Sequence, residues 1–132
     1  MFGKTPTNIC SYIFIGETGV DESASVILSC KDGEQALLYS AINIDTIKSA
    51  NILGTKGRIC PKFSSADTAH ILTNGVEEKI HLSFEINDME YQVREVLKCM
   101  NEGKIQSVIM SWNDSIEIMI IMDSVRSQMR FS

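Results

Sequence analysis

The chain has 132 residues, of which 44% are hydrophobic and 22% charged, and its formal charge is −5. This length predicts a single domain, residues 1–132, with enough apolar material for a core. The acidic balance argues against a nucleic-acid-binding protein, which needs a basic face to neutralise phosphates. No apolar run approaches the roughly 20 residues that cross a bilayer, and no secretion signal is visible. We therefore expect a cytoplasmic protein without membrane contact.

Apolar and polar residues alternate with a period of two in the first two thirds of the chain, which predicts strands. Asp32-Gly33 and Asn74-Gly75 are typical of tight hairpin turns, since these residues tolerate positive φ. Gly54–Gly57 predicts another turn rather than a phosphate-binding loop, because Arg58 replaces the required lysine and a strand follows. Pro61 should end that strand. The predicted strands are residues 8–15, 22–30, 35–43, 46–53, 58–60, 67–72 and 77–84.

The apolar period then changes to 3.6, which predicts two helices. Asn87 or Asp88 is expected to cap the first helix, and Gly103 to stop it. Ser111-Trp-Asn-Asp114 resembles a capping box before a second helix, over about 112–130, which is apolar enough to be buried on more than one side. Strands followed by helices predict an α+β fold. We expect an open, predominantly antiparallel sheet of five to six strands, with the two C-terminal helices packed on one face.

Two of the predicted strands carry large apolar side chains on both faces. Tyr12 and Phe14 alternate with isoleucines in the first strand, and Leu37 and Tyr39 belong to a similar pattern in the third. The face away from the helices is therefore too apolar to be left in water. We predict that Tyr12, Phe14, Leu37 and Tyr39 form a homodimer interface or a docking surface for another domain. The sequence leaves open which face meets the helices.

No catalytic or metal centre is visible in the sequence. The cysteines, at positions 10, 30, 60 and 99, form no CxxC pair, so we expect them to be reduced, small, buried apolar residues. His70 and His81 lie in predicted strands without a neighbouring nucleophile, although a triad can assemble in space from distant residues. Glu77, Glu78 and Glu85 are expected to be solvated charges. One possible function, ranked below the two given later, is an independent enzyme in which His70 or His81 is catalytic.

Several short motifs follow the order and spacing of one enzyme family. They are Gly19–Ser25, Asp32-Gly33, Gly54–Ile59, Tyr91-x-x-x-Glu95-Val96, Asn101-Glu-Gly103 and Met122–Arg126. Over essentially its whole length, the chain resembles the C-terminal domain of the Gfo/Idh/MocA oxidoreductases, the glucose–fructose oxidoreductase and inositol dehydrogenase family, in the dihydrodiol dehydrogenase-like branch. The resemblance implies an open sheet that commonly forms a dimer interface, and a preceding Rossmann domain that binds NAD or NADP.

The resemblance also shows what the chain lacks. The family's dinucleotide loop, its Glu-Lys-Pro segment and its catalytic His or Asp have no counterpart here, so we expect no catalytic residue, no cofactor-binding residue and no cofactor in this chain. It would be the substrate-side and dimerisation domain of a truncated NAD(P)-dependent oxidoreductase of sugars, polyols or diols, inactive alone. Phe84, Asn87 and Tyr91 are candidates to border a substrate pocket, although Tyr91 could equally be a half-buried packing residue. The alternative function is a stand-alone interaction module without an enzymatic parent.

Overall fold

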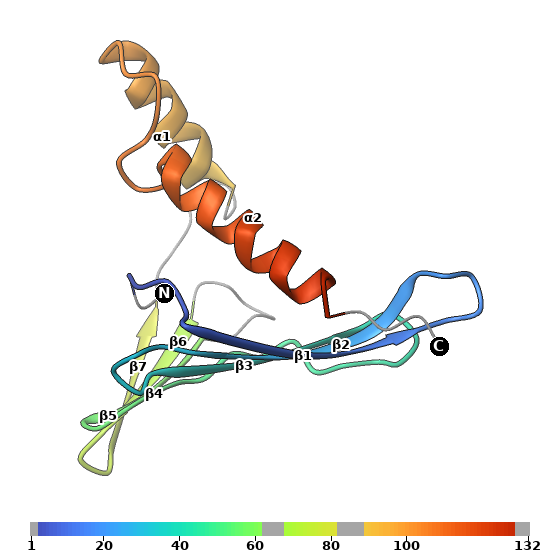
Figure 1. Ribbon diagram of the computed structural model, residues 1–132. Helices are drawn as coiled ribbons and strands as arrows, with labels where there is room; N and C mark the ends of the chain where they lie inside the picture. The colour runs from blue at the N-terminus through green and yellow to red at the C-terminus, as the bar shows by residue number, and fades with distance from the viewer. Residues whose placement is uncertain (1–2, 62–67, 82–88, 129–132) are drawn as a thin grey trace. The chain divides into compact units, whose positions relative to one another are not determined.

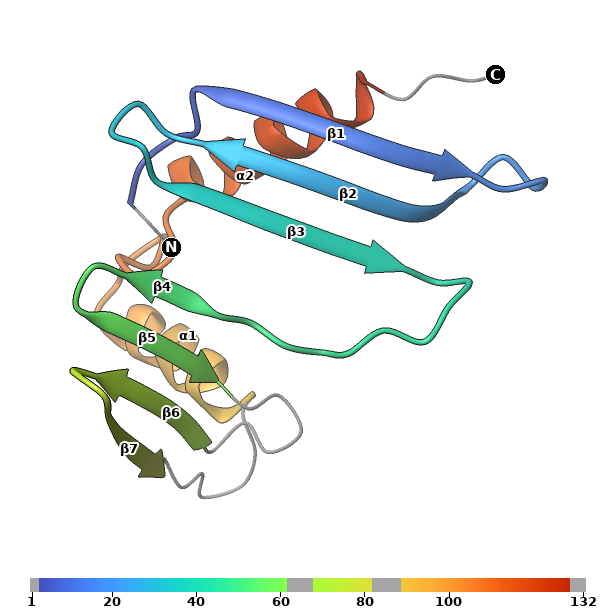
Figure 2. The ribbon, with the colours of Figure 1, turned by 90° about the horizontal axis from the view of Figure 1, so that it is seen from below.

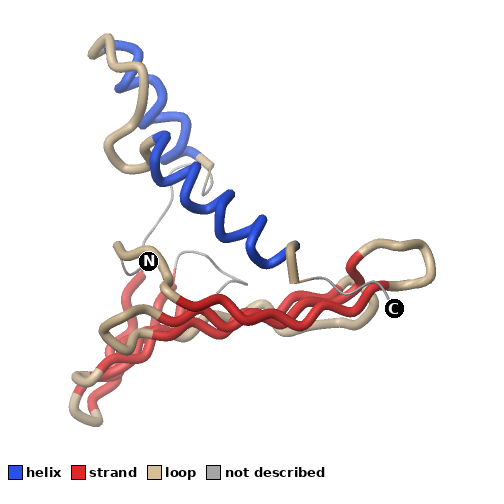
Figure 3. Tube along the Cα trace, viewed as in Figure 1, coloured by secondary structure: helices blue, strands red, loops and turns tan. Residues whose placement is uncertain are grey.

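The computed structural model describes residues 3–61, 68–81 and 89–128, and its strands precede its helices as predicted (Figures 1 and 3). The strands are β1 (Asn8–Ile15), β2 (Asp21–Ser29), β3 (Gln35–Ala41), β4 (Ile52–Gly54), β5 (Gly57–Pro61), β6 (Thr68–Thr73) and β7 (Val76–His81). The helices are α1 (Glu90–Asn101) and α2 (Trp112–Arg126). The prediction of an α+β protein with antiparallel sheets is confirmed.

The sheet arrangement differs from the single sheet of five to six strands that we expected. The described strands form two antiparallel sheets, one in the order β1-β2-β3 and the other in the order β4-β5-β6-β7 (Figure 2). The predicted strand over residues 46–53 is wrong for most of its length, because only Ile52–Gly54 pairs with a neighbour. Residues 42–51 include Asn43, Asp45 and Asn51, residue types that are depleted in strands.

The chain divides into two compact units, each containing one sheet and one helix. The first unit comprises Met1–Thr46 and Val108–Ser132, and the second comprises Ile47–Ser107. Thus β1–β3 and α2 belong to the first unit, whereas β4–β7 and α1 belong to the second. The predicted packing of both helices on one sheet is not confirmed; α2 packs on the sheet of its own unit. That residues 1–132 act as one domain stays a prediction.

In the first unit, local sequence signals act as predicted. The Asp-Gly hairpin between β2 and β3 is confirmed, with Gly33 at φ +93° and its N–H donating to the Cys30 carbonyl at 3.1 Å. The capping box of α2 is also confirmed. The Ser111 hydroxyl accepts from the Asp114 N–H at 3.2 Å, and the Asp114 carboxylate accepts from the Ser111 N–H at 2.8 Å.

The second unit begins with an antiparallel meander. Asn74 and Gly75 both have positive φ, +53° and +78°, which confirms the predicted tight turn between β6 and β7. Gly54–Gly57 joins β4 to β5 as a turn, as predicted. A Cβ on Gly57 would lie 2.1 Å from the Leu72 carbonyl oxygen, so this position requires glycine. The strand β5 ends at Pro61, also as predicted.

The two ends of α1 agree only in part with those predicted from the sequence. Gly103 adopts a left-handed φ of +64° just past the helix, which confirms the predicted stop. The N-cap is Met89, without a side-chain hydrogen bond, so neither Asn87 nor Asp88 occupies the capping position that we predicted for it. Those two residues lie outside the described part of the chain.

Very little of the described chain is buried. Only Thr68 and Cys99 are buried among residues 3–61, 68–81 and 89–128. All four cysteines are free thiols, but the prediction that each is buried holds only for Cys99; Cys10 is exposed, and Cys30 and Cys60 are intermediate. Although 44% of the sequence is hydrophobic, most apolar side chains in the described ranges remain at least partly exposed.

Candidate functional site

The face of the β1–β3 sheet opposite α2 carries a continuous group of large apolar side chains. The strand register aligns Tyr12 with Ser25 and Tyr39 across the sheet, and it aligns Ile27 with Leu37. Directly opposed residues of an antiparallel pair share a face. Phe14 is two residues from Tyr12 and therefore lies on the same face. We call Tyr12, Phe14, Ile27, Leu37 and Tyr39 the open face.

The four residues that the sequence marked as dimer-face candidates are thus all members of the open face. Tyr12 and Leu37 are each 75% exposed, and Phe14 and Tyr39 are also exposed. Aromatic residues are favoured in the desolvated centres of protein interfaces, and tyrosine adds a hydroxyl that can bond across them. This surface can bind a partner through apolar contact.

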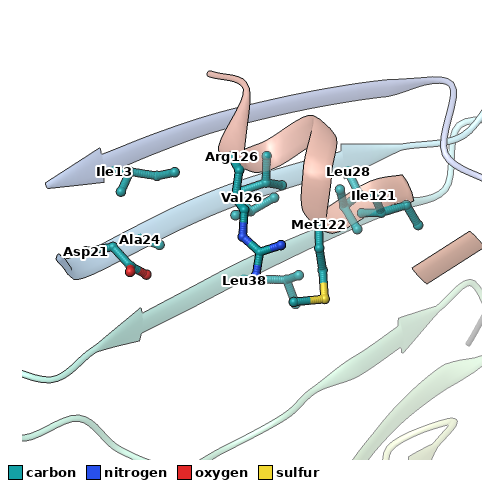
Figure 4. A pocket seen from close by; sticks show the side chains of 10 residues that line it. Ile13, Asp21, Ala24, Val26, Leu28, Leu38, Ile121, Met122 and Arg126 are labelled. Carbon is teal, nitrogen blue, oxygen red and sulfur yellow. The ribbon is translucent and has the colours of Figure 1, made fainter. Parts of the chain in front are cut away.

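The other face of the same sheet packs against α2, which answers the question that the sequence left open. Figure 4 shows Ile13, Val26 and Leu38 on the sheet below Ile121 and Met122 of the helix. A cavity of about 300 Å³ lies between the two layers. The helix and the sheet are therefore in contact without filling all the space between them.

Two charged residues border this mainly apolar cavity. They are Asp21, at the start of β2, and Arg126, whose side chain extends toward Leu38 (Figure 4). The Arg126 Nη1 also lies 3.2 Å from the Asp123 carboxylate, one turn earlier in α2. Most of the guanidinium remains exposed, so this ion pair contributes little to stability.

Gln128, which follows α2, forms hydrogen bonds with the outer edge of β1. The Gln128 Oε1 accepts from the Ser11 N–H at 2.8 Å, and its Nε2 donates to the Ile9 carbonyl at 2.9 Å. The side-chain amide thus makes the two bonds that a neighbouring strand would make. The Ser11 hydroxyl adds a bond to the Val125 carbonyl at 3.3 Å. The sequence analysis missed this contact, because no local pattern relates position 128 to position 11.

On the far side of α2, apolar residues are left uncovered within the first unit. Ile116, Met119 and Ile120 are exposed, whereas Ile121 and Val125 face the sheet side. The prediction that this helix is buried on more than one side does not hold for the described part of its own unit. Only a further chain segment or another molecule could cover this second side.

The N-terminal segment is tied to the β2–β3 hairpin by charge. The Lys4 Nζ lies 2.8 Å from the Asp32 carboxylate and also pairs with Glu34. Hydrogen bonds to these carboxylates raise the pKa of Lys4, and the bond from Lys4 lowers the pKa of Glu34. Thr5 also donates to Glu117 of α2 at 3.3 Å. These contacts position the chain as it enters β1.

In the second unit, polar contacts close the loop after α1. The Ser107 hydroxyl donates to the Glu95 carboxylate at 2.6 Å, and this bond lowers the pKa of Glu95. The Cys99 thiol lies beside it, 3.8 Å from the Gln106 carbonyl, and burial raises the pKa of this thiol. A thiol of raised pKa is a poor nucleophile at neutral pH, so Cys99 acts as a packing residue.

The substrate-pocket candidates are not brought together by the described structure. Phe84 and Asn87 lie outside the described residues. Tyr91 is on the first turn of α1 and is 56% exposed, and it does not line the helix–sheet cavity. Its role at a substrate pocket stays a prediction.

Two features are absent from the described residues. Over 3–61, 68–81 and 89–128, no three His, Cys, Asp or Glu side chains are grouped closely enough to hold a metal ion. Neither described helix combines the length and the apolar character needed to cross a bilayer.

Comparison with known proteins gives a partial match to one kind of enzyme. The chain is 35% identical to the trans-1,2-dihydrobenzene-1,2-diol dehydrogenases of Xenopus tropicalis and Xenopus laevis, and 31% identical to that of Danio rerio. Each match includes 96% of this chain. The chain is similar to part of a dihydrodiol dehydrogenase. It spans about two fifths of the curated relatives, 41% of the two frog proteins and 40% of the fish protein, and no protein-family model matches it.

Proposed function

We propose that this chain is the substrate-side and dimerisation part of an NAD(P)-dependent oxidoreductase of the Gfo/Idh/MocA family, in the dihydrodiol dehydrogenase-like branch. The observation that carries the proposal is the similarity of 96% of the chain to two fifths of enzymes named as dehydrogenases of a cyclic diol. The complete enzyme would oxidise or reduce a diol, polyol or sugar carbon. Four free thiols in the described chain are compatible with a cytoplasmic site of action.

The residues of this chain do not fit a nicotinamide dinucleotide. Such a cofactor is usually held where a glycine-rich loop leads from a strand into the N-terminus of a helix. The glycine pair at Gly54 and Gly57 instead joins two strands, and the Cβ position of Gly57 is blocked by the Leu72 carbonyl. We therefore infer that hydride transfer needs a cofactor-binding part beyond the described residues.

The open face supports the dimerisation role. Five large apolar side chains on three strands form one surface, and the opposite face is already in contact with α2. Large exposed apolar patches mark interaction sites, and a stable interface buries more than about 1,000 Å² in total. A second copy of the chain, docked through its own open face, would give a two-fold symmetric dimer.

Calorimetry and light scattering test the two parts of this proposal separately. We expect the 132-residue chain to bind no NADH or NADPH at micromolar concentrations, and to scatter light as a dimer of about twice 14.7 kDa across a dilution series. Micromolar binding of either nucleotide would contradict the proposal that another part of the enzyme binds the cofactor. A monomer at every concentration would contradict the dimerisation role.

Reconstitution tests the enzymatic parent directly. The segment of the Xenopus tropicalis enzyme that this chain does not match can be co-expressed with the chain. Nucleotide-dependent diol oxidation by the pair, and by neither part alone, is the expected result. A control with α2 shortened at Trp112 should lose activity, because the helix layer of the first unit is removed.

The alternative is a stand-alone interaction module, and the small buried core favours it equally, because exposed apolar surface calls for a partner in both cases. The two functions differ in genomic context. A reading frame that encodes a nucleotide-binding domain directly upstream of Met1 supports the oxidoreductase, and its absence, with a dimer that fails reconstitution, supports the module.

A further inference from the structure

On one face of the second sheet, three adjacent strands carry a thiol, an imidazole and a carboxylate in that order. The strand register places Cys60 of β5 directly opposite His70 of β6 (Figure 2 shows the strands). Glu77 of β7 lies diagonally across from His70, with its Oε1 2.7 Å from the His70 Nδ1. Directly opposed residues of an antiparallel pair have Cβ atoms about 4.5–5.5 Å apart on the same face, so the thiol and the imidazole are neighbours.

The contact with Glu77 determines which ring nitrogen of His70 is a base. An ionised carboxylate only accepts hydrogen bonds, so the Nδ1 of His70 carries the proton that is donated to Glu77. In the neutral ring, the Nε2 then holds the free lone pair. A His70 side chain that is 40% exposed can release a proton to water after accepting it.

The thiol itself is held in place and partly accessible. The Cys60 Sγ donates to the Asn51 Oδ1 at 3.0 Å, and the residue is neither fully buried nor fully exposed. An amide oxygen is far too weak a base to remove the thiol proton. Among the described groups on this face, His70 is the base that the strand register places directly opposite the thiol.

Positively charged side chains also lie on the face that carries Cys60 and His70. Arg58 is two residues before Cys60 on β5, and Lys79 is directly opposite His70 on β7, so both share the face of the thiol. Glu77 contributes one negative charge, which leaves an excess of positive charge near the sulfur. This excess of positive charge attracts an anionic reaction partner.

The surroundings limit the chemistry that this thiol can perform. Acyl transfer needs N–H donors aimed at a developing oxyanion, and β6 offers none beside the thiol because its backbone groups are engaged in ladders with β5 and β7. Thiol–disulfide exchange needs only a thiolate, a base and access to a second sulfur.

We propose that Cys60 is a nucleophilic thiol that exchanges with anionic low-molecular-weight disulfides, with His70 as its base and Glu77 as the residue that positions His70. The Cys60 proton passes to the His70 Nε2, and the thiolate attacks one sulfur of the disulfide. A bond from Cys60 to that sulfur forms as the disulfide bond breaks, and the departing thiolate takes the proton from His70. No further oxidant is required, because the disulfide itself is reduced. This proposal does not depend on the oxidoreductase function.

Site-resolved labelling tests the reactivity of the thiol. The 132-residue chain is incubated with oxidised glutathione, and the mixed disulfide on each cysteine is followed by mass spectrometry of peptides. We expect Cys60 to react about tenfold faster than Cys30, which has similar exposure, and faster than Cys60 in the urea-unfolded chain. A folded Cys60 that reacts no faster than the unfolded one overturns the proposal.

A second disulfide separates the role of charge. Cystamine carries two amines in place of the carboxylates of glutathione. We expect the ratio of the Cys60 rate to the Cys30 rate to be higher with oxidised glutathione than with cystamine, because of Arg58 and Lys79. Equal ratios, or a higher ratio with cystamine, would rule out the preference for anionic disulfides.

Matched variants test the base and its positioning residue. His70→Gln should bring the Cys60 rate down to that of Cys30, and free imidazole should restore part of it, which a purely structural role would not allow. Glu77→Gln should lower the rate about threefold to tenfold, and Glu77→Asp should retain more of it. Glu78→Gln, on the opposite face of β7, is the control and should change nothing. If His70→Gln does not fold by circular dichroism, the Glu77 and Glu78 pair decides, and equal rates in those two variants overturn the assignment.

Discussion

The two faces of the β1–β3 sheet carry similar side chains but have different surroundings. Ile13, Val26 and Leu38 on one face lie under α2, whereas Tyr12 and Leu37 on the other face are three-quarters exposed. Both faces are apolar, so composition alone does not determine which one a helix covers. Within the described part of the first unit, α2 covers one face of this sheet and leaves the other exposed, which supports the proposal that a second copy of the chain covers it.

The largest effect on the difference between the two faces is expected from a charge placed on the open face. Leu37→Asp should raise the dissociation constant of the dimer about 100-fold, because a carboxylate would be desolvated at the interface. Sedimentation or light scattering across a dilution series measures the effect. Ser40→Asp, on the same strand but the opposite face, is the control and should leave the dimer intact. An unchanged dimer in both Leu37→Asp and Tyr39→Asp would show that the open face is not the interface.

A smaller effect is expected from the covered face. Ile121→Ala should lower the free energy of unfolding by about 2 kcal/mol, because it removes apolar contact beside an existing cavity. Urea denaturation at fixed chain concentration measures this. Ile120→Ala, on the neighbouring exposed position of α2, should change the free energy by less than about 0.5 kcal/mol. Equal effects would mean that α2 does not use this side against the sheet.

Substitution of the capping box tests how much the cap of α2 contributes to the stability of the helix that covers one face of the sheet. Ser111→Ala should cost about 1 kcal/mol of unfolding free energy, because the Asp114 N–H loses its partner. Hydrogen bonds from Ser111 lower the pKa of Asp114 below its ordinary 3.8, so the unfolded chain binds this proton more readily. The stabilisation is complete above pH 3.8 and is lost as the pH falls through the lowered pKa. Acid titration of unfolding should show a larger loss in the parent chain than in Ser111→Ala, which keeps only the backbone N–H bond to the Asp114 carboxylate.

The smallest expected effect is local. Gln128→Ala should increase hydrogen exchange at the Ser11 amide about tenfold, because this N–H then faces water instead of the Gln128 Oε1. The Val26 amide, on the central strand β2, serves as the internal control and should keep its protection. Protection of Ser11 that survives the substitution would mean that another group covers the edge.

Local patterns predicted much of the fold because they depend on neighbours in sequence. The β-rich run over residues 8–15 gives β1 at its observed bounds, and Asn74-Gly75 adopts the tight turn predicted for it, with both residues at positive φ. The segment 46–51 was predicted as part of a strand over 46–53, but no described strand pairs with it. Apolar content without a ladder does not make a strand.

The candidate sites were harder to predict from the sequence because they depend on the register in which the strands pair. The dimer-face residues could be proposed from their parity, but only the pairing with β2 shows that Tyr12 and Tyr39 lie on one line. Glu77 is exposed, as expected for a solvated charge, but its contact with His70 on the neighbouring strand was not predicted. The opposition of Cys60 and His70 likewise arises from strand pairing, which no local pattern encodes.

The amide of Gln128 has one more consequence, for the solubility of the chain. A sheet edge with unpaired N–H and C=O groups is a template onto which further strands can add, and the danger grows when the strand is as apolar as β1. Gln128 occupies the first pair of these groups, at Ile9 and Ser11, with a side chain that cannot itself be extended by another strand. Fibrillar growth from this edge would have to begin by lifting the end of α2 from the sheet. Gln128, just after the end of α2, is thus expected to hinder ordered aggregation through this edge.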